Sequence, residues 1–385
     1  MQTSYLVRSA LGLLFLTFCT SISAQQDTKF EDHLQEGFKQ AKLRNWDKAV
    51  EAFSMAVELD PKSAEAQRNL GASYLNLGRC REALGPLETA IGLEPLNPAS
   101  HFYKGTCMIS LRRVDEAYDS LTEALRLDPK NPQVHNMLGL WMSNAGRFED
   151  AIRSYRTSAE LLPNDPANYH NIGLMYMRIG RFQEAIEPLE KAVSIQPGYR
   201  SAWFHLSGAF SRTFRFKDAA ESWRKVSELD PSSPLAVSNI AWNYLYDGSS
   251  GMDAARYAEI YLERFGWKTE SSPFMAMVAI LGYRSYGLKA EAEGMATRAL
   301  EKCDRGVWGY TLIRFHSGEI DADKLMELAV DNNKKTEANA YIGMDLKLRG
   351  ETDKAREHFE WVSKFGNVQY FEHLLALAEL RRSSK

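Results

Sequence analysis

Apolar residues follow the 3.6-residue period of the α-helix along most of the chain, in segments that come in pairs. Across residues 64–77 they recur at i, i+3 and i+4, which predicts an amphipathic helix of about a dozen residues. After a short turn, a second segment follows and ends in Leu-Asp-Pro or a near equivalent, as at Leu59-Asp60-Pro61. Proline lacks an amide hydrogen and stops a helix, so the pattern predicts pairs of helices separated by turns.

The prolines that end these pairs are evenly spaced. Six of the 13 prolines lie 34 residues apart, namely Pro61, Pro95, Pro129, Pro163, Pro197 and Pro231. A constant period of this length indicates an internal repeat. One unit is too small to bury its own apolar face and must stack on its neighbours, so the sequence predicts one continuous array.

Small residues recur at fixed places in the repeat, which is numbered here from Phe30 as position 1. Small side chains allow two helices to cross closely, so each unit is predicted to be a helical hairpin. Position 20 holds Ala49, Ala83, Ala117, Ala151, Ala185 and Ala219. Position 8 holds Gly37, Gly71, Gly105, Gly139 and Gly173, then Ser207.

Glycine at position 15 marks the end of the first helix, where a left-handed residue is needed and glycine adopts it without strain. It occurs as Gly78, Gly146 and Gly180, and again as Gly248, Gly287 and Gly350. These glycines extend the register beyond the regular prolines. The predicted organisation is six regular repeats over 30–233, two degenerate repeats over 234–306, a shortened hairpin over 307–335 that turns at Gly318, and a further repeat over 336–368.

Residues 369–385 are predicted to form a capping helix and a tail. Leu374, Leu375, Leu377 and Leu380 make its apolar face, and Glu372, Arg381 and Arg382 are expected on the outside. Such a helix is suited to cover the apolar surface at the open end of a stack.

The first 24 residues have the order of a secretory signal peptide. Arg8 precedes a short apolar run from Ala10 to Phe18, and small or polar residues lead to Ala24, after which we expect cleavage. Residues 25–29 are then a short N-terminal segment. The prediction is an exported protein of the periplasm or extracellular space, with no membrane span after cleavage. Lipid anchoring at Cys19 is the less favoured alternative, because Phe18 is too bulky for a lipobox.

Composition and motifs limit which ligands and reactions are expected. The net charge of −3 gives no basic stripe, so nucleic acid is not an expected partner. No catalytic motif occurs, and no cofactor is predicted. His33, His101 and His135 share position 4, but neighbouring hairpins lie about 10 Å apart, too far for a shared metal. Cys80, Cys107 and Cys303 are expected to be buried free thiols, with a Cys80–Cys107 bridge left open.

The columns resemble the tetratricopeptide repeat (TPR): small at 8, large or aromatic near 11 (Tyr74, Tyr176, Phe210, Tyr244), alanine at 20 and 27, and proline at 32. The resemblance covers roughly residues 30–368 in ten hairpins. It implies an all-α fold, a right-handed α-solenoid of tandem hairpins closed by the C-terminal capping helix. The C-terminal part, with Tyr341-Ile342-Gly343 and Tyr370-Phe371-Glu372-His373, loosely resembles TPR proteins of the bacterial cell envelope.

The resemblance also implies a peptide-binding groove, because TPR first helices line the concave side through positions 2, 5, 6, 9, 12 and 13. The groove residues carried over in this way are Asn69, Phe102, Leu140, Asn171, Leu174, Met177, Arg178, Phe204, Arg212, Asn239, Trp242 and Leu245, with Met277 and Leu281 beyond them. The apolar members would hold a peptide by side-chain burial. They could equally fill contacts between adjacent hairpins.

These observations favour a non-catalytic exported scaffold that binds a protein or peptide segment in its groove. The alternative is a structural assembly or export-complex factor of the bacterial cell envelope that works through its convex face or its ends. A remote alternative is an accessory domain of an enzyme such as a glycosyltransferase, since TPR arrays accompany such enzymes.

Overall fold

The computed structural model describes residues 26–383, and every regular element in that range is a helix. The all-α fold predicted from the repeat is therefore confirmed. The chain divides into two compact units, one ending at Asn171 and the other beginning at Ile172.

The first unit is a series of helical hairpins in which the consecutive helices between residues 46 and 161 pack on each other. A helix described from residue 26 to residue 42 comes first. It is followed by α2 (Trp46–Leu59), α3 (Ala64–Asn76), α4 (Cys80–Leu93), α5 (Pro98–Ser110), α6 (Val114–Leu127), α7 (Pro132–Asn144), α8 (Phe148–Leu161) and the start of α9 (Pro166–Arg178).

The second unit continues the series and ends in a helix that returns to earlier ones. Its further helices are α10 (Phe182–Ile195), α11 (Arg200–Arg212), α12 (Phe216–Leu229), α13 (Pro234–Asp247), α14 (Gly251–Phe265), α15 (Ser272–Ser285), α16 (Lys289–Lys302), α17 (Trp308–His316), α18 (Ala322–Leu328), α19 (Asn332–Leu348), α20 (Thr352–Phe365) and α21 (Phe371–Ser383). The short helices α17 and α18 lie on either side of Gly318.

The helix ends follow the sequence signals. Asn97 and Asn131 accept hydrogen bonds from the first amides of α5 and α7, and proline takes the first position of each of these helices. All six position 15 glycines have the left-handed φ that was predicted, between 72° and 84°. Arg44, Arg112 and Phe214 hold the same position in three other units, with φ of 59°, 58° and 63°.

Close helix crossing explains the glycines at position 8. A Cβ built on Gly71 would lie 2.5 Å from Leu87 Cγ, the position 24 residue of the same hairpin. The same close crossing occurs in the last repeat, where a Cβ built on Gly343 would lie 2.7 Å from Cε1 of Phe359. The register of the last repeat is therefore the register of the first ones, because an identical crossing recurs about 270 residues further on.

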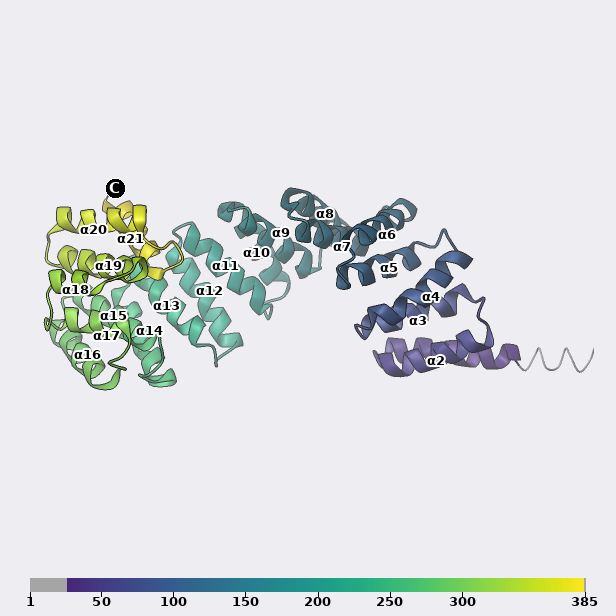
Figure 1. Cartoon of the computed structure of the whole chain (residues 1–385), viewed down its shortest axis with the longest axis horizontal. Coiled ribbons are helices and arrows are strands. Elements are labelled where there is room, and N and C mark those ends of the chain that lie inside the picture. The colour runs from purple at the N-terminus through teal and green to yellow at the C-terminus, as the bar shows by residue number, and fades with distance from the viewer. Residues whose placement is uncertain (1–25, 384–385) are drawn as a thin grey trace, which may run out of the picture. The chain divides into compact units, whose positions relative to one another are not determined.

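The final helix α21 does more than cover the end of the stack. It contacts α19 and α20, which precede it directly, and also α13, from which it is separated by seven helices (Figure 1). Because it packs against three helices, most of its residues are buried or half-buried. The expectation that Glu372 lies outside is therefore wrong, since this side chain is only 2% exposed.

Candidate functional site

In the first unit the predicted groove residues are all half-buried. Phe102 packs on the core formed by Leu121, Val134 and their neighbours, and so contributes to contacts between hairpins. The Asn69 side chain donates a 2.8 Å hydrogen bond to the carbonyl oxygen of Glu65 on its own helix. Leu140 on α7 and Asn171 on α9 are likewise half-buried. These four remain predictions of ligand contact.

In the second unit, neighbouring first helices bring five predicted residues onto one surface. We call this the α9–α11 surface, and it consists of Leu174, Met177 and Arg178 from α9 with Phe204 and Arg212 from α11. Phe204 and both arginines are exposed, and the other two are half-buried. A Cβ built on Gly208 would lie 3.2 Å from Met177 Cε, which places the end of the Met177 side chain against α11.

The exposed ring of Phe204 packs against a buried tryptophan. It is 41% exposed, yet its edge packs on Trp223 with 5.1 Å between ring centroids and an interplanar angle of 83°. The Arg212 guanidinium lies 5.6 Å from the Phe182 ring centroid, within cation–π range. Burial lowers the pKa of the adjacent His205; a backbone hydrogen bond at Ser201 opposes this shift, and the Arg178 charge adds to it. The exposed charges of this surface are those of Arg178 and Arg212.

The structure corrects the prediction for Trp242 and Leu245, which are buried. Trp242 is 1% exposed and Leu245 is 4% exposed, and the same holds for Met277 and Leu281 further along. The ring of Phe371 on α21 lies parallel to Trp242 at 5.3 Å between centroids. These inward-facing positions therefore form a core and offer no open groove. The Asn239 side chain is half-buried and donates to Leu235 on its own helix.

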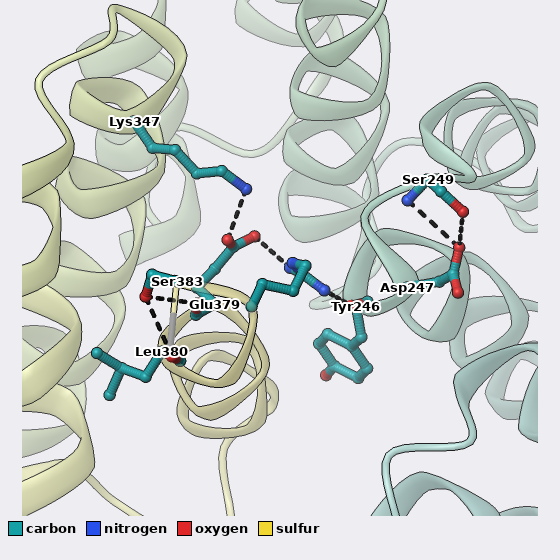
Figure 2. A network of polar contacts seen from close by, with 8 residues as sticks. Tyr246, Asp247, Ser249, Lys347, Glu379, Leu380 and Ser383 are labelled. Atoms are coloured by element: carbon teal, nitrogen blue, oxygen red, sulfur yellow. Dashed lines mark hydrogen bonds and ion pairs between the residues drawn. The ribbon is translucent and has the colours of Figure 1, made fainter. Parts of the chain in front are cut away.

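Polar contacts fix α21 against α13 and α19. Tyr246 on α13 donates a 3.0 Å hydrogen bond to the Phe371 carbonyl oxygen, and Arg382 donates to the carbonyl oxygen of Tyr246. Lys347 on α19 donates a 2.5 Å hydrogen bond to Glu379 on α21. The two side chains point toward each other in Figure 2. Arg382 also pairs with Glu379. These contacts hold both ends of α21 against earlier helices of the second unit.

Sequence reasoning did not identify Glu337 and placed Glu372 outside, yet both carboxyl groups are buried. Glu337 on α19 is 5% exposed, and Tyr341 donates a 3.0 Å hydrogen bond to Glu372 Oε1. Burial raises the pKa of Glu337 well above its ordinary value, and the nearby Glu372 raises it further; burial raises the pKa of Glu372 as well. A signal did exist, because Glu337 is position 2 of its repeat, one of the inward-facing positions.

Other chemistry is limited in the described residues. Cys80, Cys107 and Cys303 are buried free thiols, as predicted, and no bridge joins the first two. Burial raises the pKa of Cys303 to about 11. Within residues 26–383 no group of three or more His, Cys, Asp and Glu side chains is placed to hold a metal ion. No helix in this range is long and apolar enough to cross a membrane. The predicted signal peptide and Cys19 lie outside the described residues.

Hairpins with this repeat, crossing and register define a tetratricopeptide-repeat protein. A family model described as the cilia and flagella-associated protein 70 C-terminal domain matches residues 34–234, more than half of the 385 residues. The chain therefore belongs to this TPR family.

Solved structures of TPR proteins are similar to parts of the chain. The structure titled as YrrB, a TPR protein with an unusual peptide-binding site, is 22% identical, with a TM-score of 0.42, and covers 49% of this chain and 97% of its own. PilF of Pseudomonas aeruginosa is 19% identical, with a TM-score of 0.45, over 53% and 92% of the two chains. A MamA protein is 23% identical, with a TM-score of 0.39, over 44% and 92%.

Proposed function

We propose that this protein is a non-catalytic scaffold that binds a protein or peptide segment along the first helices of its regular repeats, with the α9–α11 surface as the main contact. The single observation that carries the proposal is the exposed ring of Phe204 on α11, which packs edge-on against Trp223, on a surface where α9 and α11 each end in an exposed arginine. A rigid aromatic side chain loses little conformational entropy when a ligand covers it.

The charges of the α9–α11 surface favour an acidic ligand. Arg178 and Arg212 are exposed, and no carboxylate belongs to the surface as defined. Guanidinium groups bind carboxylates through paired hydrogen bonds, and Leu174, Met177 and Phe204 supply apolar contact. The expected ligand is an extended or helical segment with apolar anchors and one or more Asp or Glu side chains, or a chain-terminal carboxylate.

Crosslinking in the native compartment, followed by mass spectrometry, would identify the partner. The isolated partner segment is then titrated against the wild-type protein, Phe204→Ala and Arg212→Glu. Loss of a buried aromatic contact costs about 2 kcal/mol or more at a binding hot spot, so each variant should weaken binding by about 30-fold. Lys225→Glu, an exposed charge reversal on the second helix α12, is the control and should bind normally.

Equal binding by Phe204→Ala, Arg212→Glu and the wild type would contradict the proposal. Purification of a stable stoichiometric complex that survives both changes would instead favour the assembly-factor alternative, in which the convex face or the ends make the contact. Conversion of a substrate by the purified chain would contradict its non-catalytic role.

We also propose that the chain is exported and that residues 1–24 are removed. The support is the order of charge, apolar run and small residues that ends at Ala24. N-terminal sequencing of the protein from its native source should begin at Gln25. A chain that retains Met1, or that begins with lipidated Cys19, would contradict cleavage at this site.

A further inference from the structure

Two cysteines, Cys80 and Cys107, belong to one buried cluster of the first unit. Cys80 is the first residue of α4, and Cys107 lies in α5, the next helix along the chain. Both pack with Ala83 and Leu87 of α4 in this cluster, and they are 4% and 0% exposed. The two thiols share a hydrogen bond. Their sulfur atoms are therefore direct neighbours across the boundary between two hairpins.

The register of the repeat explains why these two residues meet. Cys80 is position 17 of its repeat, at the start of the second helix, and Cys107 is position 10 of the next repeat, on the first helix. The same two positions meet one repeat further on, where Trp141 Nε1 donates a 2.7 Å hydrogen bond to the carbonyl oxygen of Val114. The contact therefore comes from the stacking of successive hairpins and does not depend on cysteine.

Among the regular repeats, cysteine occupies both positions at this one boundary. The other pairs at positions 17 and 10 are Trp46 with Ser73, Val114 with Trp141, Phe148 with Met175, Phe182 with Ala209 and Phe216 with Asn243. Cys303, the third cysteine of the described residues, is buried in the core of the second unit with no other cysteine in its cluster. Within residues 26–383, Cys80 and Cys107 are therefore the one pair of neighbouring thiols.

The surroundings of the pair determine when it can react. Burial raises the pKa of Cys107 well above its ordinary value, and the hydrogen bond with Cys80 raises it further. The thiolate is the nucleophile in disulfide exchange, so the covered thiols of the folded chain react slowly. In an unfolded chain a cysteine has a pKa of about 8.5, and part of it is ionised in mildly alkaline solution. Oxidation is therefore expected while the two hairpins assemble and not afterwards.

We propose that Cys80 and Cys107 form a disulfide bond when the chain folds in the presence of a disulfide oxidant, and that this bond links the second hairpin to the third. The thiolate of one cysteine attacks the oxidant, which forms a mixed disulfide and releases one thiol. The thiolate of the other cysteine then attacks the protein sulfur of the mixed disulfide and releases a second thiol. Two protein thiols are thereby oxidised, and the oxidant is reduced to two thiols, which carry the two protons.

A bond at this boundary stabilises the stack locally. In a repeat array each hairpin contacts mainly its neighbours, so stability depends on the boundaries between them. A disulfide between α4 and α5 also restricts the unfolded chain. The inference is independent of the proposed ligand binding, because neither cysteine belongs to the α9–α11 surface. It is also tested without export of the chain, because the oxidant is added to the purified protein.

The experiment is refolding of the fully reduced wild-type chain from urea into oxidised glutathione at about pH 8, where unfolded thiols are partly ionised. The reaction is stopped with acid, the free thiols are alkylated in denaturant, and the peptides are mapped by mass spectrometry without reduction. We expect Cys80 linked to Cys107, while Cys303 takes up the alkylating reagent. Alkylation of Cys80 and Cys107 in most of the product, or their linkage to Cys303 or to glutathione alone, would overturn the proposal.

Two further measurements relate the bond to the stack. The oxidised wild type should unfold at a temperature several degrees higher than the reduced wild type. Cys303→Ala is the control and should keep this difference, whereas Cys107→Ala should abolish it. The folded, reduced protein should form the bond about tenfold or more slowly than refolding chains do, because its thiols are covered. Equal unfolding temperatures of the two forms would contradict the link between hairpins, and equal rates would contradict oxidation during assembly.

Discussion

Single residues set how closely the two helices of each hairpin approach. Gly71 on α3 faces Leu87 on α4, and a Cβ at Gly71 would lie 2.5 Å from Leu87 Cγ. Both positions are buried, so an added methyl group must push the helices apart or force Leu87 into a poor rotamer. The same pairing recurs along the array, which is why position 8 tolerates only small residues.

We therefore expect Gly71→Ala to destabilise the protein by about 1–3 kcal/mol, since overpacking outweighs the better helix propensity of alanine. Gly92→Ala in the same hairpin is the control, because a Cβ at Gly92 would have no atom within 4 Å. It should stabilise by about 0.5–1 kcal/mol. Urea unfolding measures both, and a stabilising Gly71→Ala would contradict the close crossing.

At position 15 the backbone conformation, and not side-chain packing, determines which residue is most stable. Arg112 has a φ of 58° where Gly146, in the next repeat, has a φ of 73°. A left-handed backbone costs a residue with a Cβ about 1 kcal/mol. Arg112→Gly should therefore raise the free energy of unfolding by about 1 kcal/mol, and Gly146→Ala should lower it by a similar amount. Equal effects of the two substitutions would show that φ is not the cause.

At the scale of elements, the sequence predicted the hairpins well and the final helix only in part. The 34-residue period, the prolines and the position 15 glycines are local signals, and each reports on contacts within one or two repeats. The docking of α21 on α13 joins Tyr246 to Phe371, which are 125 residues apart, and no periodic pattern reports such a contact. Position 9 correctly marks Trp242 as inward-facing, but facing inward is compatible with a groove and with a core.

Because α21 contacts α13 and α19, detachment of α21 should increase hydrogen exchange in these two helices and not in distant ones. Leu375 is fully buried on α21, and Leu375→Asp would place a charge in the core, so α21 should detach. Hydrogen exchange of α13 and α19 should increase about tenfold or more, while exchange in α3 and α4 stays unchanged. Ser383→Ala, at the exposed end of α21, is the control. Unchanged exchange in α13 would contradict the observed packing.

At the scale of the whole molecule, the buried carboxyl groups are concentrated in the second unit. Glu337 and Glu372 both have a raised pKa in the folded state. The unfolded chain releases these protons near pH 4.3, whereas the folded chain retains them to higher pH, so stability is fully present below about pH 4.3 and is lost as pH rises through the folded values. Within the described residues, these two carboxyl groups therefore lower the stability of the fold as the pH rises.

Replacement of both groups should remove this sensitivity. Between about pH 5 and about pH 8 the wild type is expected to lose on the order of a few kcal/mol of stability from these two carboxyl groups. The double variant Glu337→Gln, Glu372→Gln should lose distinctly less, as measured by urea unfolding at each pH. The exposed pair Glu293→Gln, Glu357→Gln is the control and should follow the wild type. A steeper loss in the buried double variant would reverse the sign and contradict the raised pKa values.

The return of α21 to α13 has a consequence for how the polypeptide acquires its structure. Hairpins of the first unit contact only near neighbours in sequence and can fold in order as the chain emerges during synthesis. The core around Trp242 cannot close until Phe371 is available, which is nearly the last part of the chain to be made. Completion of the second unit therefore depends on an intact C-terminus, and premature termination near the end would leave earlier helices without their partner.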